Sequence, residues 1–383
     1  MKNFIKFVER LHKENYVALH ARLVEEKIPC AVVSASSEED TKKFIDRLRA
    51  EGLNIDRLIF ATSSAPNFFQ SDIEIDLLRD FSKLRPRPQF IFVDTELDYK
   101  FAATIDAPDL TIIKPPLKLS TTQKAVDVCM SNISKLYELY SQLIDEESRR
   151  VLCGYWLARV TRKFGEIVQA STPHYICSGF APKPDDIVIQ AGACDGNTAA
   201  WFADMGCKVY AFEMDRQNYE LAVPLAQKKN FVLENLGLGA FNHEEHYTHY
   251  DFIAASAFDV SGTFTTQVVS LDSYVLEHKI PRIDFITLDV EGAEEDVLRG
   301  AACSIARWKP ALAISAYHKL DDFWKLTELI KSICPNYELA MRHYVNTSES
   351  EPILFDDRTL KMFKAHELEA SMISIAECVL LAR

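Results

Sequence analysis

The chain has 383 residues, of which 48% are hydrophobic and 26% are charged, and its formal net charge is −13. At roughly 150 residues per domain this length predicts two domains, or two and an appendage, and the composition excludes a disordered chain. An acidic surface repels phosphate backbones and anionic lipids, so we expect neither a nucleic acid nor a membrane as a partner.

No apolar run approaches the roughly 18 residues that a membrane-spanning helix needs. The first residues carry Lys2 and Lys6 where a secretory signal would have its apolar stretch. The nine cysteines are scattered and form no C-x-x-C pair, which indicates neither a disulfide framework nor a zinc knuckle. We therefore expect a cytoplasmic protein.

The first hundred residues alternate between helical and extended patterns. We expect helices over residues 3–27 and 38–51, and buried strands at the apolar runs 30–34, 58–61, 90–93 and 110–113. Strands of this kind, separated by helices, predict a small parallel sheet covered on both faces. The interpretation is an accessory N-terminal α/β domain over residues 1–116, closed by two prolines.

The loop after the first of these strands contains no glycine, and Glu38, Glu39 and Asp40 follow it. These acids would repel a phosphate. We expect the front domain to be structural, to form a homodimer, or to grip part of an acceptor. Behind it, apolar residues recur every three or four positions over 133–144, and a second helix is predicted over 146–169. Residues 117–170 are therefore predicted to form a helical hairpin linker.

The pattern of residues 171–383 is more strongly α/β. Helices are predicted at 197–205 and 216–228, and apolar strands at 187–190, 209–213, 231–234, 285–289 and 311–315. This alternation predicts a doubly wound, Rossmann-like sheet with ligands at the carboxyl ends of its strands. The closing antiparallel strands come from 337–344 with either 352–356 or 376–382, and the sequence leaves their order open.

The first strand of this rear domain runs directly into a loop of small residues and then a helix. Gly192 and Gly196 allow a tight turn and a close approach by a ligand, and Asn197 or Thr198 can cap the helix. Glu213 ends the next strand, 21 positions after Gly192. An acid at that distance can accept hydrogen bonds from both hydroxyls of a ribose. The segment therefore favours an adenosine-type ligand over an unliganded turn.

Two classes of cofactor share this geometry. A nicotinamide site needs G-x-G-x-x-G, whereas the glycines here have the spacing G-x-x-x-G, and Asp195 would place an anion near the phosphates. S-adenosylmethionine has no phosphate and carries a cationic sulfonium, which nearby acids attract. The residues favour the methyl donor, and a nicotinamide-dependent oxidoreductase is the enzymatic alternative.

A second segment adds a family resemblance. The apolar strand at 285–289 leads into Asp289-Val290-Glu291-Gly292-Ala293-Glu294. This run resembles the hallmark of the FkbM-type family of S-adenosylmethionine-dependent methyltransferases, and the resemblance covers about residues 171–356. It implies the class I methyltransferase fold and, usually, O-methylation of a sugar or secondary-metabolite hydroxyl. The expected acceptor is a small molecule or a saccharide.

The resemblance also assigns site residues. Gly192 and Gly196 match the donor loop, Glu213 the ribose-binding acid, Asn235 and Leu236 the positions that read the adenine edge, and Asp289 and Glu291 the hallmark acids. The predicted cofactor-binding set is completed by Gln190, Ala193, Asp195, Asn197 and Met214.

One of these positions departs from the family pattern. Gln190 stands where this fold commonly has an acid, so Asp195 or Asp289 must serve the methionine ammonium. A degenerate, non-catalytic binding or scaffold protein is the alternative that this departure supports.

Methyl transfer to an alcohol needs a group that takes up the hydroxyl proton. His318 follows the strand at 311–315, and histidine is a common base near neutral pH, so His318 is the first candidate and Asp289 the second. Glu291 could instead bond the backbone of the Gly292-Ala293 turn. Glu294 and Glu295 open a helix and favour its dipole.

His243, His246 and His249 lie with Glu244 and Glu245 on a segment predicted as strand or loop. On a strand, side chains three positions apart point to opposite faces and cannot meet at one ion. The sequence therefore predicts no metal site here.

Overall fold

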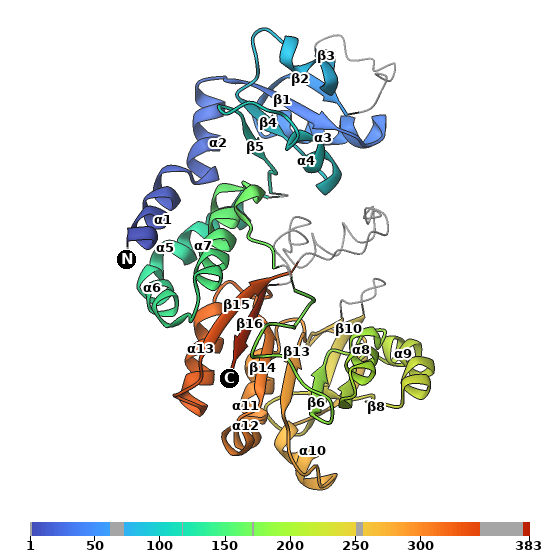
Figure 1. Ribbon diagram of the computed structural model, residues 1–383. Coiled ribbons are helices and arrows are strands. Elements are labelled where there is room, and N and C mark those ends of the chain that lie inside the picture. Colours follow the sequence, from blue (N-terminus) through green and yellow to red (C-terminus); the bar gives the residue numbers. More distant parts are fainter. Residues whose placement is uncertain (1, 62–72, 117, 171, 250–255, 345–377) are drawn as a thin grey trace. The chain divides into compact units, whose positions relative to one another are not determined.

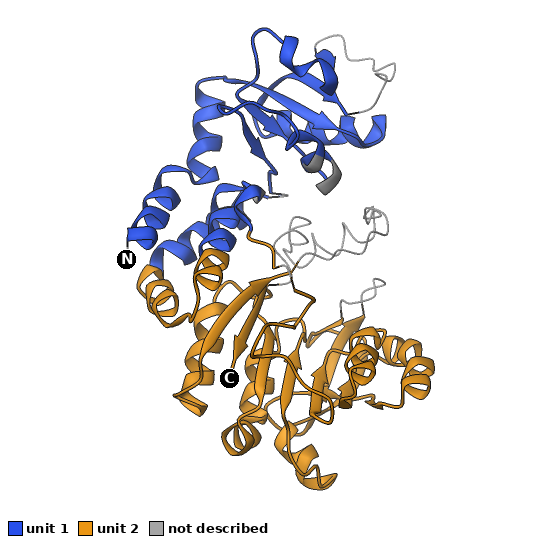
Figure 2. Cartoon of the chain, in the orientation of Figure 1, with its two compact units in different colours: residues 1–131, 153–167, 347–375 blue, residues 132–152, 168–346, 376–383 orange. Residues whose placement is uncertain are grey.

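The computed structural model describes residues 2–61, 73–116, 118–170, 172–249, 256–344 and 378–383. The chain divides into two compact units, coloured separately in Figure 2. Unit 1 comprises residues 1–131, 153–167 and 347–375, and unit 2 comprises residues 132–152, 168–346 and 376–383.

Unit 1 is built on a five-stranded sheet in the order β3-β2-β1-β4-β5, in which every pairing is parallel (Figure 1). The alternating helices and apolar runs predicted this arrangement, except that β3 was not foreseen. Burial of both faces of the central strand β1 explains its continuous apolar run. The strands are β1 (Pro29–Ser34), β2 (Asn54–Phe60), β3 (Glu74–Leu77), β4 (Phe90–Phe92) and β5 (Thr111–Ile113).

The helical pattern predicted over 3–27 forms two helices instead of one. Asn15 separates them, because its side chain accepts a hydrogen bond from the Ala18 amide at 2.8 Å and so caps the second helix. Unit 1 contains α1 (Lys2–Lys13), α2 (Tyr16–Glu25), α3 (Glu38–Ala50), a 3₁₀ helix (Leu78–Lys83), α4 (Glu96–Ala102) and α5 (Leu119–Ser131).

Helix α6 (Ile133–Gln142) belongs to unit 2. Helix α7 (Glu146–Thr161) contributes its first seven residues to unit 2 and the rest to unit 1. The predicted helix over 146–169 therefore ends earlier, at Thr161, and a 3₁₀ helix follows at Phe164–Glu166.

Unit 2 contains a seven-stranded sheet in the order β15-β16-β14-β13-β6-β7-β8. Only β16 runs antiparallel to its neighbours, β14 and β15. The doubly wound α/β fold is thus confirmed, and of the two options for the closing strands the one at 376–382 is correct; residues 352–356 lie outside the described residues. The strands are β6 (Ile187–Ala191), β7 (Lys208–Phe212), β8 (Val232–Glu234), β13 (Phe285–Leu288), β14 (Ala311–Ser315), β15 (Leu339–His343) and β16 (Cys378–Ala382).

The helices of unit 2 form two packed groups. Helices α8 (Asn197–Asp204) and α9 (Arg216–Lys229) pack on each other. The second group comprises α10 (Leu271–Glu277), α11 (Glu294–Gly300), α12 (Ala302–Trp308) and α13 (Asp322–Ile333). The core between sheet and helices includes Phe202 and Phe285, whose ring centroids lie 5.6 Å apart.

A second, four-stranded sheet in the order β11-β10-β12-β9 lies between β8 and α10 in the chain and was not predicted. Its longest strand carries the polar sequence His-Glu-Glu-His-Tyr-Thr-His, which shows no apolar periodicity. The strands are β9 (Gly237–Leu238), β10 (His243–His249), β11 (Ser256–Phe258) and β12 (Phe264–Val269).

Candidate functional site

The loop after β6 turns on Gly192. This residue has φ of +81°, and a Cβ atom there would overlap the backbone carbonyl of Asp289. Only glycine fits both the left-handed backbone and this close approach. Gly192 therefore lets the loop after β6 meet the end of β13, where the hallmark acids begin.

Glu213 directly follows β7, and its carboxylate bonds this loop. Its Oε2 accepts a hydrogen bond from the Cys194 amide at 2.7 Å, and its Oε1 accepts one from the Asp215 amide at 2.9 Å. Burial raises the pKa of Glu213 to about 7, although the two amides favour the charged form. Each oxygen keeps lone-pair capacity for a further donor.

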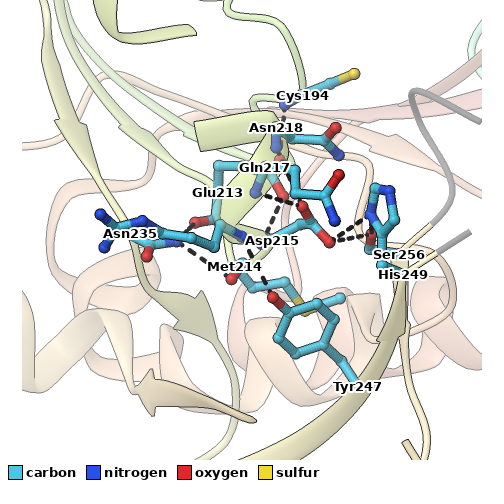
Figure 3. A network of polar contacts seen from close by, with 11 residues as sticks. Cys194, Glu213, Met214, Asp215, Gln217, Asn218, Asn235, Tyr247, His249 and Ser256 are labelled. Carbon is cyan, nitrogen blue, oxygen red and sulfur yellow. Dashed lines mark hydrogen bonds and ion pairs between the residues drawn. The ribbon is translucent and has the colours of Figure 1, made fainter. Parts of the chain in front are cut away.

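Asn235, predicted to read the adenine edge, points elsewhere. Its side-chain amide donates to the backbone carbonyls of Glu213 at 2.8 Å and Met214 at 3.2 Å (Figure 3). The side chain thus fixes the turn after β7, and Asn235 is absent from the pocket lining described below. Its side-chain nitrogen is committed to the backbone, and the role of Asn235 as a base contact stays a prediction.

Asp215 organises a network that the sequence did not reveal. The carboxylate is fully buried, and its Oδ1 accepts the amides of Gln217 at 2.8 Å and Asn218 at 3.1 Å, which caps α9. Its Oδ2 accepts the hydroxyl of Ser256 at 2.8 Å and lies 2.7 Å from Nδ1 of His249 (Figure 3). Asp215 therefore ties the β10–β11 pair of the second sheet to the turn after β7.

A pocket opens where these loops converge and contains about 740 Å³ of empty space, counting its mouth. The lining includes the apolar residues Met214, Leu236, Leu238 and Phe258 and the acids Asp289 and Glu291. Glu213 also lines the pocket. The remaining lining residues are Ala191, Gly192, Cys194, Phe212, Asn218, Gly237, Ser256, Val290 and Tyr317.

Six residues of the predicted site line this pocket: Gly192, Glu213, Met214, Leu236, Asp289 and Glu291. The lining does not include Gln190, Ala193, Asp195, Gly196, Asn197, Asn235 or His318. Asp195 instead accepts the Asn197 amide at 3.0 Å, and Gly196 supplies the left-handed backbone that starts α8. These residues shape the loop.

Gln190, the departure from the family pattern, is buried within β6. Among the described residues its side-chain oxygen has no hydrogen-bond partner. The amide therefore adds no charge to the site.

Asp289 is held by two tyrosines that sequence reasoning missed. The Tyr175 hydroxyl donates to its Oδ2 at 3.0 Å, and the Tyr317 hydroxyl lies 3.3 Å from its Oδ1. Tyr175 precedes β6 by more than ten residues in a segment without a strand or helix pattern, so no local signal could have identified it. The two contacts fix the carboxylate at the rim of the pocket.

His318 meets three carboxylates. Its Nδ1 lies 2.8 Å from Glu294, and its Nε2 lies 3.4 Å from both Asp289 and Glu291. Burial by itself lowers the pKa of His318, but the charges of Glu294, Glu291 and Asp289 outweigh it and raise the pKa well above its ordinary value. A protonated imidazole cannot accept a proton, so the arrangement argues against His318 as the base, and that role stays a prediction.

The same cluster has the composition of a metal site. Asp289, Glu294 and His318 each offer a ligand atom within 4.8 Å of the others. By contrast, the histidines of β10 have separate partners: His243 pairs with Glu245, His246 lies beside the Gly262 carbonyl, and His249 pairs with Asp215. These three histidines lie in strand β10, so successive ones point to opposite faces of the sheet.

Comparisons with known proteins agree with this architecture. Residues 190–346 match the family model described as the methyltransferase FkbM domain. The crystal structure of methyltransferase FkbM from Methylobacillus flagellatus superposes with a TM-score of 0.63 at 17% sequence identity, covering 100% of this chain and 98% of that one. The resemblance to the FkbM methyltransferase family is therefore confirmed over residues 190–346, and the superposition supports the fold.

Two other solved structures are more distant. An O-methyltransferase from Bacillus cereus, in complex with SAH, has a TM-score of 0.32 at 12% identity and covers 75% of this chain and 96% of that one. An rRNA methylase from Streptococcus thermophilus has a TM-score of 0.28 at 16% identity, covering 52% and 86%. At these TM-scores neither adds to the assignment, and no curated protein matches the chain. Among the helices of the described residues, none combines the length and apolar character that crossing a bilayer requires.

Proposed function

We propose that this chain, with an FkbM methyltransferase domain at residues 190–346, binds S-adenosylmethionine in the pocket of unit 2 and transfers its methyl group to a hydroxyl of a saccharide, a polysaccharide precursor or a glycosylated metabolite. The observation that carries the proposal is the position of Glu213. Its carboxylate lines a pocket together with apolar residues and two further acids.

The residues fit this donor along the whole pocket. Glu213 would accept the ribose hydroxyls, since both of its oxygens keep lone pairs beside their backbone partners. Met214, Leu236, Leu238 and Phe258 offer an apolar space for a flat base. Asp289 and Glu291 would face the cationic end of the donor, where carboxylates attract a positive charge.

When bound, the donor supplies an electrophilic methyl carbon on a positively charged sulfur. The residues of the chain would align the acceptor oxygen with that carbon, and alignment alone lowers such barriers by several kcal/mol. Of the two candidate bases, we assign the acceptor proton to Asp289, because Tyr175 and Tyr317 orient its carboxylate at the pocket rim. His318 would act as the charged partner that keeps the acids in place.

The test is a transfer assay with methyl-labelled donor and a panel of mono- and oligosaccharides. We expect label in an alkali-stable O-methyl ether, and a turnover number at saturating donor at least about a hundredfold lower in Asp289→Asn. Tight donor binding without transfer to any acceptor would favour the non-catalytic alternative. Absence of donor binding at millimolar concentration would overturn the proposal.

A further inference from the structure

The pocket raises the question of which side chain recognises the edge of the base. Asn235 is absent from the pocket lining, and its side-chain nitrogen donates to two backbone carbonyls. The second sheet contributes two residues of β11 to the pocket lining, Ser256 and Phe258. Ser256 is thus a polar side chain of the lining on the same strand as the aromatic Phe258.

The hydrogen bonds of Asp215 determine what Ser256 can offer. Oδ1 of Asp215 is occupied by two amides of α9, and Oδ2 accepts the Ser256 hydroxyl at 2.8 Å. A carboxylate this deeply buried, with four partners, has no freedom to turn. The single proton of Ser256 is therefore committed to Asp215, and its Oγ keeps only lone pairs for a ligand.

His249 reinforces this assignment from the neighbouring strand. Ser256 and His249 are directly opposite each other in the antiparallel β10–β11 pair. Nδ1 of His249 lies 2.7 Å from the same Asp215 oxygen, so this nitrogen carries the hydrogen that Asp215 accepts. The same nitrogen lies 3.4 Å from Ser256 Oγ, and no donor among the described residues is closer to this oxygen (Figure 3).

We propose that Ser256 Oγ accepts a hydrogen bond from the exocyclic amine of the donor's base, so that the site selects a 6-aminopurine over a 6-oxopurine. A carbonyl at that position would face the serine lone pairs and leave both acceptors unpaired, which recognition sites reject strongly. Phe258, two positions along β11, provides an aromatic wall beside the base. This inference rests on the proposed function, because it concerns the base of the same donor.

The test compares the affinities of S-adenosylhomocysteine and its deaminated analogue S-inosylhomocysteine by titration calorimetry. We expect the unmodified protein to prefer the adenosyl compound by at least about tenfold. In Ser256→Ala the preference falls to less than about threefold, mainly through weaker binding of the adenosyl compound. Ser256→Cys, nearly isosteric but a weak acceptor, gives the same loss and covers the case in which the alanine variant does not fold.

Ser261→Ala is the matched control, since the Ser261 hydroxyl donates to Asp259, away from the Asp215 network, and its variant keeps the full preference. Retention of the preference in folded Ser256 variants, or equal affinities in the unmodified protein, would overturn the inference alone. Failure of both compounds to bind at millimolar concentration would instead count against the proposed function.

Discussion

The two units share one strand order around their first strand. They differ at the point where sheets of this kind bind ligands. In each, strand order reverses beside the first strand of the unit, at β1/β4 in unit 1 and at β6/β13 in unit 2. Such switch points are where open α/β sheets bind ligands. The pocket described above lies at the switch point of unit 2.

In unit 1 an internal carboxylate bonds the loops at this switch point. Asp98, almost fully buried, accepts the Ala35 amide after β1 at 2.7 Å and the Thr95 amide after β4 at 3.0 Å. The loop amides are thus satisfied within the chain. In unit 2 an acid after a different strand, Glu213 after β7, also bonds the loop and lines the pocket. The same strand order therefore carries loop amides bonded within the chain in unit 1 and a pocket in unit 2.

The largest effect is expected from Gly192→Ala. The added methyl group meets the Asp289 carbonyl and forces a non-glycine residue into φ of +81°. We expect donor binding to be lost and the melting temperature of unit 2 to fall. Gly52→Ala, at another positive φ but in unit 1 against the Val24 side chain, serves as the control and should leave donor affinity intact. Normal donor affinity in Gly192→Ala would contradict the account of this loop.

The next largest effect is expected from Glu213→Ala. Loss of two charge-assisted hydrogen bonds to the ribose should weaken donor binding about a hundredfold, as measured by calorimetry. Glu213→Gln keeps one acceptor oxygen and should lose less. An unchanged dissociation constant in the alanine variant would mean that this carboxylate does not touch the donor.

Asp98→Ala is the mirror experiment in unit 1. Removing an acceptor from two buried amides should lower the free energy of unfolding of that unit by about 3 kcal/mol, followed by chemical denaturation. Donor affinity should not change, because the carboxylate serves only the fold. A combined loss of stability and donor binding would contradict the claim that Asp98 serves only the fold of unit 1.

A smaller effect is expected from pH. Burial raises the pKa of Glu213 to about 7, and ribose hydroxyls need its ionised form as an acceptor. Donor affinity should therefore fall by up to about tenfold per pH unit below 7 and level off above it. The dependence should disappear in Glu213→Gln.

The stability of the ligand-free protein should change in the opposite direction. Glu213 and Asp322 both have a pKa raised to about 7 by burial, so their protonated forms stabilise the folded chain at low pH. That contribution is fully present below about pH 4 and is lost as the pH rises through 7. Parallel pH profiles for stability and donor affinity would contradict the assignment.

The sequence predicted what is encoded locally. An apolar strand, small residues and a helix start make the 187–197 segment recognisable, and Glu213 follows at a fixed distance along one strand–helix–strand unit. The second sheet escaped prediction, because β10 is polar and shows no apolar periodicity. Ser256, Tyr175 and Tyr317 enter the site only through tertiary packing.

The sequence also could not predict the directions of the side chains. Asn235 lies where a base contact was predicted, but its side-chain nitrogen donates to backbone carbonyls of the turn after β7. His318 was predicted as a base from its position after β14, yet the three acids around it depend on folding of the whole 289–294 turn. Neither orientation nor charge environment can be read from spacing alone.

A crystal structure with S-adenosylhomocysteine tests the central claim most directly. We expect the ligand in the pocket of unit 2, with both ribose hydroxyls on the Glu213 carboxylate and the base beside Phe258. A ligand bound elsewhere, or an empty pocket at saturating concentration, would contradict the account.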